Sequence, residues 1–377
     1  MSDSIAQALD KLPASTRAAL SRHGFQEALF MELAERLRRG LVDQRFQGVV
    51  EPPAPGDIAR LEDFGSAERA KLEELGRAAL GEGRCALVVL AGGMATRMGG
   101  VVKALVEALP GRSFIDLRLA AQSSDARCYG SRVPLWLMTS YATDEPIRRA
   151  LGSQVNGAQL ATFEQRVSLR LTPSGELFLD KNGEPSLYAP GHGDLPDALQ
   201  QSGLLEQFVA RGGRALLVTN LDNLGGTIDP MILGFHLQHG QPVTSEVVDK
   251  LASDRGGIPI RIRGQTRAFE EFRLPREFDP KRVGVFNTNV FHFDARALLE
   301  LDMEWQYVPI EKQLGGERVI QFERILNEIT GALTTRFLHV PRSGAGARFL
   351  PCKDVEELGQ RRPEIEAVAR ARGMLEP

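Results

Sequence analysis

Short apolar runs separated by stretches of helical periodicity dominate the chain from residue 84 onward. The runs CALVVL, VPLWLMT, ALLVT and VFNTNVFHF are typical of buried strands. Between them, segments such as 198–213 and 229–240 place apolar residues at helical spacing. Strands that alternate with helices predict an α/β fold with a mainly parallel sheet covered on both faces.

The pattern before residue 81 is helical instead. Residues 1–40 have apolar positions at helical spacing and end at Gly40, and a Pro-rich connector follows at 51–57. A further helix is predicted from about Ser66 to Leu80. We therefore expect a helical N-terminal segment at 1–80, an α/β core at 81–345 and a short C-terminal segment at 346–377.

Composition narrows the possible partners. The formal net charge is −3, with 42% hydrophobic and 25% charged residues, so no basic excess indicates nucleic acid or an anionic membrane. No run approaches the roughly 18 apolar residues that span a bilayer, and the first residues do not resemble a secretory leader. Three scattered cysteines fit neither a disulfide framework nor a metal site, which favours a cytoplasmic setting.

The strongest local signal is LAGGMATRMGGVVKAL at 90–105. Glycines directly after a buried strand let backbone amides approach a ligand and form a cradle for an anion. The segment is not a Walker A loop, because Lys103 is followed by Ala104, and it lacks the dinucleotide pattern G-x-G-x-x-G. A simple strand-to-helix turn with surface cations is the alternative.

Three further polar positions are candidates for chemistry. Asp222 follows an apolar strand and could hold Mg²⁺ beside phosphates, although taken alone NLDN is more typical of an Asx turn or a helix cap. His192 lies between small residues in PGHGD, and Lys353 follows the apolar run RFLPC. Each of these two could also be an ordinary surface residue.

The order of the motifs is more informative than any one of them. The series LxGGxxTxMG…K, TFxQ, PGHGD, NxDNLG, GG, FNTN and FLPxK resembles the eukaryotic-type UDP-glucose pyrophosphorylase family. The resemblance runs from about Leu90 to Leu358. It implies a Rossmann-like nucleotidyltransferase core of the GT-A type at 81–345. It also implies a Mg²⁺-dependent conversion of UTP and glucose-1-phosphate to UDP-glucose and pyrophosphate.

The resemblance also assigns roles to individual residues. The catalytic cations would be Lys103 and Lys353, and the metal ligand would be Asp222. Gln165 and Gly191 would read the uracil. The other residues expected to contact UTP or the sugar phosphate are Leu90, Ala91, Gly92, Gly93, His192, Asn220, Leu221, Gly256, Gly257, Glu270 and Asn289.

Three departures from the family pattern stand out. Ala95 replaces a usual glycine, the loop from Thr96 to Lys103 is one residue shorter, and no hexapeptide repeats of a C-terminal β-helix follow Lys353. We therefore do not expect oligomerisation through such a domain. Two alternatives remain open: a pyrophosphorylase for galactose-1-phosphate or N-acetylglucosamine-1-phosphate, and a non-catalytic sensor of nucleotide sugars.

Overall fold

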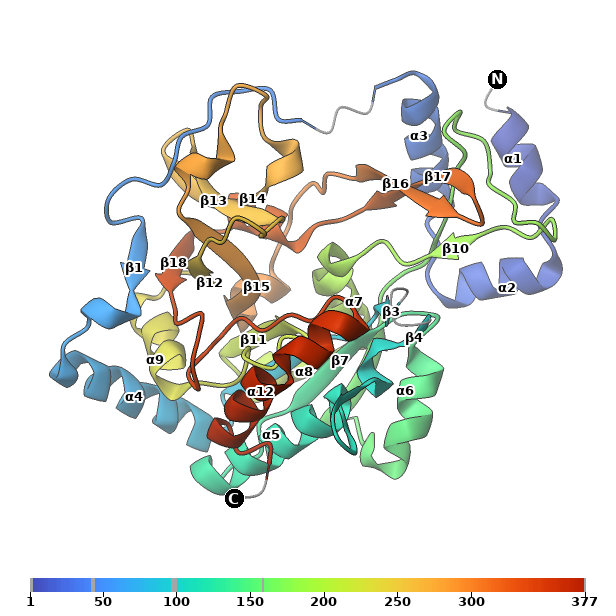
Figure 1. Cartoon of the computed structure of the whole chain (residues 1–377). Coiled ribbons are helices and arrows are strands. Elements are labelled where there is room, and N and C mark those ends of the chain that lie inside the picture. The colour runs from blue at the N-terminus through green and yellow to red at the C-terminus, as the bar shows by residue number, and fades with distance from the viewer. Residues whose placement is uncertain (1–2, 42–44, 96–99, 158, 376–377) are drawn as a thin grey trace.

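A sheet of eight strands runs through the centre of the molecule (Figure 1). The computed structural model describes residues 3–41, 45–95, 100–157 and 159–375. In spatial order the strands are β1 (Ile58–Arg60), β18 (Thr335–His339), β12 (Val243–Asp249), β15 (Val285–Asp294), β11 (Ala215–Asn220), β2 (Cys85–Leu90), β7 (Leu135–Thr139) and β8 (Leu160–Glu164).

The predicted mainly parallel sheet is confirmed, with one strand as the exception. β15 pairs antiparallel with both of its neighbours, β11 and β12, and all other pairs are parallel. Val218 of β11 lies opposite Phe291 of β15. Because β15 runs in the opposite direction, its FNTN residues pass the carboxyl end of β11. This is the edge at which ligands bind in open α/β sheets.

Helices cover both faces of the sheet, as predicted. Alternate residues of β2 serve the two sides: Leu87 and Val89 belong to one apolar cluster, Ala86 and Val88 to the other. The first face is covered by α4 (Ser66–Gly81), α5 (Phe114–Tyr129), α6 (Asp144–Leu151), α9 (Pro230–His239) and α12 (Val355–Ala371). The second is covered by α7 (Leu195–Ser202), α8 (Leu204–Ala210), α10 (Ala295–Leu299) and α11 (Ile329–Ala332).

The predicted helix over 198–213 is divided in the structure. Gly203 has a φ of 70°, in the left-handed region, so the chain turns there between α7 and α8. Thr143 precedes α6 as expected, but its side chain makes no capping bond to the helix. Its hydroxyl accepts a hydrogen bond from the Ser140 N–H instead.

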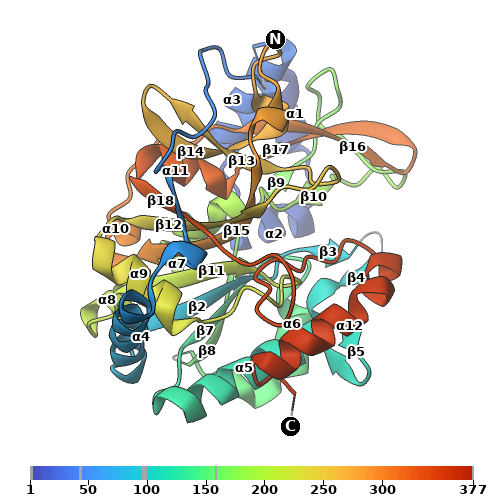
Figure 2. The ribbon, with the colours of Figure 1, turned by 60° about the vertical axis from the view of Figure 1, so that its left-hand side comes forward.

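The N-terminal helices pack on a separate layer of short strands. α1 (Asp3–Asp10), α2 (Ala14–Arg22) and α3 (Glu27–Arg38) share an apolar cluster with β9 (Ser168–Leu169) and β17 (Glu317–Glu323). The remaining strands of this region are β10 (Leu187–Tyr188) and β16 (Val308–Leu314). Figures 1 and 2 place these helices and α12 toward opposite ends of the molecule.

Several elements were not predicted from the sequence. β1 lies in the helical N-terminal segment, and β13 (Gly257–Ile262) forms a hairpin with β14 (Gln265–Glu270). The short strands around the glycine-rich loop are β3 (Met94–Ala95), β4 (Val101–Val102), β5 (Glu107–Leu109) and β6 (Arg112–Ser113). Within the described residues, no helix is both long and apolar enough to cross a bilayer.

Candidate active site

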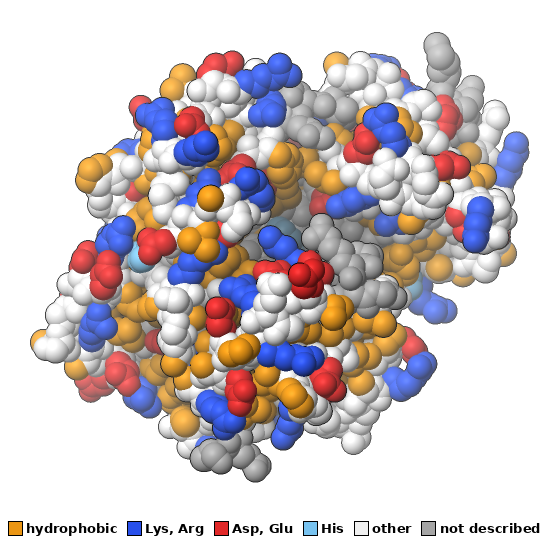
Figure 3. Space-filling model, in the orientation of Figure 1, with side chains coloured by type: hydrophobic (Ala, Val, Ile, Leu, Met, Phe, Trp, Pro, Cys, Tyr) orange, Lys and Arg blue, Asp and Glu red, His pale blue; other side chains and the backbone are white. Residues whose placement is uncertain are grey.

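Two adjoining pockets lie beyond the carboxyl ends of the central strands and share His192 and Asn220. The glycine-loop pocket, about 320 Å³, is lined by Leu90, Ala91, Gly92, Gly93, Lys103, Met138, Gln165, Ala189, Gly191, His192, Asn220, Leu221, Asp222 and Glu323. The second, about 460 Å³, is named the amide pocket, and its predicted residues are His192, Asn220, Gly256, Gly257, Glu270, Asn289 and Lys353. Figure 3 shows a hollow near the centre of this face. The structure thus brings all the predicted site residues together, whereas Thr96–Gly99 of the motif lie outside the described residues.

Gly92 allows the side chain of Gln165 to lie against the backbone of the glycine-rich loop. A Cβ at Gly92 would overlap the Gln165 amide nitrogen Nε2. The Gln165 side chain is buried, directly after β8, and its Oε1 accepts a hydrogen bond of 3.2 Å from the Gly191 N–H. This bond fixes which end of the amide is which. Oε1 faces Gly191, so Nε2 is left as the donor on the other side.

Lys103 and Asp222 form an ion pair inside the glycine-loop pocket. Lys103 Nζ lies 2.8 Å from Asp222 Oδ2, and both side chains are largely buried. The same Oδ2 accepts from the Cys352 N–H at 3.1 Å, while no described residue donates a hydrogen bond to Oδ1. The pocket therefore presents a cation and a carboxylate within contact distance of each other, close to the amides of the loop.

His192 joins the two pockets and is held as a hydrogen-bond donor. Its Nδ1 accepts a hydrogen bond of 3.0 Å from the Leu326 N–H, so in the neutral ring the proton is on Nε2. Desolvation lowers the pKa of His192, and the charge of Glu323 only partly opposes that effect. His192 is therefore a neutral imidazole whose Nε2–H is available to a ligand.

Asn289 supplies an acceptor at the boundary of the amide pocket. It adopts a φ of 58°, a left-handed conformation that asparagine tolerates better than most residues. Its Nδ2 donates to Asn220 Oδ1 at 3.1 Å, and its buried Oδ1 has no partner among the described residues. A buried acceptor without a partner is costly, and a ligand hydroxyl would satisfy it.

A chain of side-chain hydrogen bonds orients Glu270 in the same pocket. Ser245 Oγ donates to Asn287 Oδ1, Asn287 Nδ2 donates to Asn327 Oδ1, and Asn327 Nδ2 donates to Glu270 Oε1, at 2.9, 2.9 and 2.7 Å. Burial raises the pKa of Glu270 to about 7, although the nearby charge of Arg273 lowers it. The carboxyl group therefore titrates near neutral pH, with its second oxygen available to a ligand.

Lys353 reaches the amide pocket because its segment is bound to the NLDN loop. Asn223 Nδ2 donates to Arg348 O at 3.0 Å, Asn223 Oδ1 accepts from Leu350 N–H at 2.8 Å, and Asp222 accepts from Cys352 N–H. The C-terminal segment thus folds back over the site. It is held in place because α12 is packed on the core through Leu358, Ile365 and Ala369. The Lys353 side chain is exposed.

Comparison with known proteins decides the family. A family model described as UTP--glucose-1-phosphate uridylyltransferase matches residues 28–362. The chain belongs to the UTP–glucose-1-phosphate uridylyltransferase family. The Saccharomyces cerevisiae UTP--glucose-1-phosphate uridylyltransferase is 32% identical over 299 residues, which cover 73% of this chain and 58% of the yeast protein. The chain thus spans less than two thirds of that curated relative.

Solved structures of this fold include enzymes for two different sugars. A UDP-glucose phosphorylase from Trypanosoma brucei is 20% identical with a TM-score of 0.75, covering 91% of this chain and 77% of that one. The uridine diphosphate N-acetylglucosamine pyrophosphorylase from Trypanosoma brucei is 19% identical with a TM-score of 0.76, covering 97% and 81%. These likenesses show the fold, and they leave the sugar to be argued from the site.

Two supporting residues of this family member were missed by sequence reasoning. Arg118 of α5 is fully buried and donates to the carbonyl oxygens of Asn220, Leu221, Asn223 and Gly226 at 2.6–3.3 Å. Burial lowers its pKa to about 10, which leaves it charged. An arginine among the apolar residues of FIDLRLAAQ was the available signal. Asn327 had no such signal, since it meets Glu270 only through the fold.

Proposed function

We propose that the chain transfers a uridylyl group from UTP to glucose-1-phosphate, forming UDP-glucose and pyrophosphate. The observation that supports this most directly is the junction of the two pockets at His192 and Asn220. UTP would occupy the glycine-loop pocket, and the sugar phosphate the amide pocket. The curated relatives carry this activity in their names, including those of yeast and barley. The three free cysteines also favour a cytoplasmic setting.

The reaction needs positioning and charge neutralisation more than proton transfer. An oxygen of the sugar phosphate attacks the α-phosphorus of UTP in line, and the bond to the β-phosphate breaks as pyrophosphate leaves. The attacking oxygen is already an anion at neutral pH, so no general base is required. Lys103 on one side and Lys353 on the other would offset the charge that gathers at the junction. His192 would donate from Nε2 to a phosphate oxygen there.

The residues present fit a Mg²⁺ ion held together with substrate phosphates. No group of three or more His, Cys, Asp or Glu side chains in the described part of the chain could hold a metal by itself. Mg²⁺ typically uses one or two carboxylates plus substrate phosphates and water, and Asp222 offers one carboxylate with a free Oδ1. When bound, the ion would neutralise charge on the triphosphate and polarise its phosphoryl oxygens.

The amide pocket suits a hexose, and the names of the relatives favour glucose among the hexoses. The Glu270 carboxyl group and the unpartnered Asn289 Oδ1 are acceptors for hydroxyl groups, as a hexose requires. Pyrophosphate release should be measured with UTP and a panel of glucose-, galactose- and N-acetylglucosamine-1-phosphate. The highest kcat/KM with glucose-1-phosphate would support the proposal. Stabilisation by UDP-sugar without any pyrophosphate release would indicate a sensor instead.

A further inference from the structure

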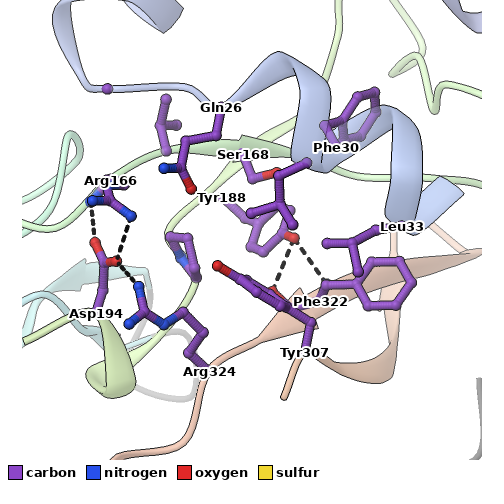
Figure 4. Close-up of a pocket in the computed structure, with 14 residues that line it drawn as sticks. Gln26, Phe30, Leu33, Arg166, Ser168, Tyr188, Asp194, Tyr307, Phe322 and Arg324 are labelled. Atoms are coloured by element: carbon purple, nitrogen blue, oxygen red, sulfur yellow. Dashed lines mark hydrogen bonds and ion pairs between the residues drawn. The ribbon is translucent and has the colours of Figure 1, made fainter. Parts of the chain in front are cut away.

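Asp194, the last residue of PGHGD, lies outside both pockets yet is one of the most deeply buried carboxylates. Its exposed fraction is 1%. Figure 4 shows it in contact with both Arg166 and Arg324, on the opposite side of the view from Phe30 and Leu33. Arg166, Asp194 and Arg324 come from three segments that are far apart in the sequence. The proposed transfer reaction gives none of these three residues a task.

The first contact of Asp194 is with Arg166, the residue that follows Gln165, and Gln165 is expected to recognise the uracil. The Arg166 N–H donates to Asp194 Oδ2 at 2.6 Å. Gln165, one residue earlier, accepts from the Gly191 N–H through its side chain. Two hydrogen bonds therefore connect residues 165–166 to the loop 191–194. Together they fix the distance between the Gln165 amide and the Gly191 backbone.

The second contact of Asp194 is with a segment that supports the same loop from behind. Arg324 Nη1 donates to Asp194 Oδ1 at 2.8 Å, and the Arg324 guanidinium lies 4.0 Å from the centre of the Trp305 ring. The Arg324 main chain donates to Pro190 O and accepts from the Gly193 N–H. Two residues later, the Leu326 N–H binds His192 Nδ1. Asp194 thus links the base end of the site to the segment that sets the His192 tautomer.

The energetics point to positioning as the role of this pair. A buried ion pair adds little net stability over a packed apolar pair, because desolvation offsets the attraction. Its best attested use is to fix one arrangement among several. Here the arrangement concerns the Gln165 amide: with Oε1 on Gly191, Nε2 faces the base as a donor. A donor suits a carbonyl of uracil, whereas the amino group of cytosine would require an acceptor.

We propose that Asp194 and Arg324 are positioning residues that hold the Gln165 amide in the orientation that accepts uracil and rejects cytosine. The inference rests on the proposed function, since it assumes that UTP occupies the glycine-loop pocket. Neither residue touches substrate. If Asp194 no longer binds the Arg166 N–H and Arg324, the hydrogen bond between the Gly191 N–H and Gln165 weakens. The Gln165 amide is then free to rotate by half a turn, and its Oε1 can accept a hydrogen bond from cytosine.

The test compares Asp194→Asn with Asp197→Asn. Asparagine has one acceptor oxygen, so at position 194 it keeps either the Arg166 N–H or Arg324, not both. Asp197 Oδ2 accepts from Arg166 Nη1 and Arg324 Nη1 at 2.9 and 2.7 Å but from neither main chain. Asp197→Asn therefore removes the same charge but leaves the bond between the Arg166 N–H and Asp194, and with it the loop, in place. We expect the ratio of kcat/KM for UTP over CTP to fall at least tenfold, about 1.4 kcal/mol, in Asp194→Asn only.

The outcomes separate this inference from the proposed function. If the parent protein releases no pyrophosphate from UTP and any sugar-1-phosphate, the proposed function fails. The inference is then tested by comparing the thermal shifts that UTP and CTP give with the parent and with the two variants. If the parent prefers UTP and Asp194→Asn, folded by circular dichroism, keeps that preference, the inference is wrong. Equal losses of preference in both variants would also overturn it. Should Asp194→Asn not fold, Arg324→Lys is the second variant: it keeps the charge but loses the planar guanidinium that lies on Trp305 and binds Asp194. It must lower the same ratio or the inference fails.

Discussion

The glycine-loop pocket and the amide pocket adjoin, yet different parts of the chain build them. The segments that follow β2 and β11 line much of the first, where Gly92 and Gly93 expose the backbone, and its polar side chains include Lys103, Gln165, His192 and Asp222. The second depends on side-chain amides and a carboxyl group from β14, β15 and the segment after β17. The triphosphate part of a nucleotide can be held by backbone, whereas a hexose requires individually placed acceptors. The first pocket should therefore respond to changes in backbone space, and the second to changes in side-chain identity.

The largest effect is expected at the junction of the pockets. Removing one positioned charge-stabilising group typically lowers kcat by about 10²–10³, roughly 2.7–4 kcal/mol. We expect Lys353→Ala to lower kcat by that order in a pyrophosphate-release assay, with a smaller change in the Kd for UTP and an unchanged melting temperature. Lys71→Ala, at an exposed lysine of α4, is the control. A kcat within about twofold of the parent would return Lys353 to an ordinary surface role.

The second largest effect should arise in the glycine-loop pocket. Asp222→Asn removes the charge that would hold Mg²⁺ and that pairs with Lys103. We expect at least a tenfold loss of kcat/KM, about 1.4 kcal/mol, together with a weaker dependence of the rate on Mg²⁺. Titration of the metal at saturating UTP, with EDTA as the zero point, measures both. A variant with the parent's metal dependence would show that Asp222 is a turn former and no more.

Two glycine substitutions test the comparison directly, because each should affect one substrate. A Cβ at Gly92 would overlap the Gln165 amide, and a Cβ at Gly257 would lie 2.5 Å from Asn327 Nδ2. Gly92→Ala should raise the KM for UTP, and Gly257→Ala the KM for the sugar phosphate, each roughly tenfold. Full steady-state kinetics with both substrates varied would show this crossed pattern. If both variants raised the same KM, the division into two pockets would be wrong.

The smallest effect concerns the pH dependence of Glu270. With a folded pKa of about 7, the ionised carboxylate is lost as the pH falls through 7. The KM for the sugar phosphate should therefore rise severalfold from pH 8 to pH 6. Glu270→Gln should have a higher KM at pH 8 and should lack this additional rise. Since the titration of the sugar phosphate itself affects both proteins equally, their ratio isolates Glu270.

The raised pKa of Glu270 also predicts how stability depends on pH, and here acid pH is favourable rather than unfavourable. Its folded pKa lies above its ordinary value of 4.5, so between pH 4.5 and about 7 the folded state binds more protons than the unfolded state. The contribution of Glu270 to the free energy of unfolding is therefore fully present at acid pH and is lost as the pH rises to 7. Glu270→Gln should gain stability relative to the parent between pH 5 and pH 8. Urea unfolding at both values measures the difference, and a gain in the other direction would contradict the raised pKa.

How much could be predicted from the sequence also differs between features built by the backbone and features built by side-chain contacts. Glycines at 92 and 93 after a buried strand, and the position of Asp222 after the next parallel strand, identify backbone-built features in the sequence itself. The strands β2, β7, β11 and β15 were predicted for the same reason, since buried strands are apolar runs. Asn327 and Arg118 act through contacts with residues distant in sequence, and no local pattern marks such contacts. β1 was missed because three residues beside a Pro-rich connector show no period.

The four carbonyl bonds of Arg118 also determine the direction of the peptide dipoles in the NLDN loop. In a planar trans peptide the N–H points opposite to the C=O of the preceding residue. Because the carbonyls of Asn220 and Leu221 point at the guanidinium, the N–H groups of Leu221 and Asp222 point away from it. Leu221 N–H is used by Leu90 O, but the Asp222 N–H donates to no residue that the structure describes. Arg118 thus turns the negative, carbonyl ends of these peptide dipoles inward. The positive N–H end at Asp222 is left facing outward, as an incoming anion requires.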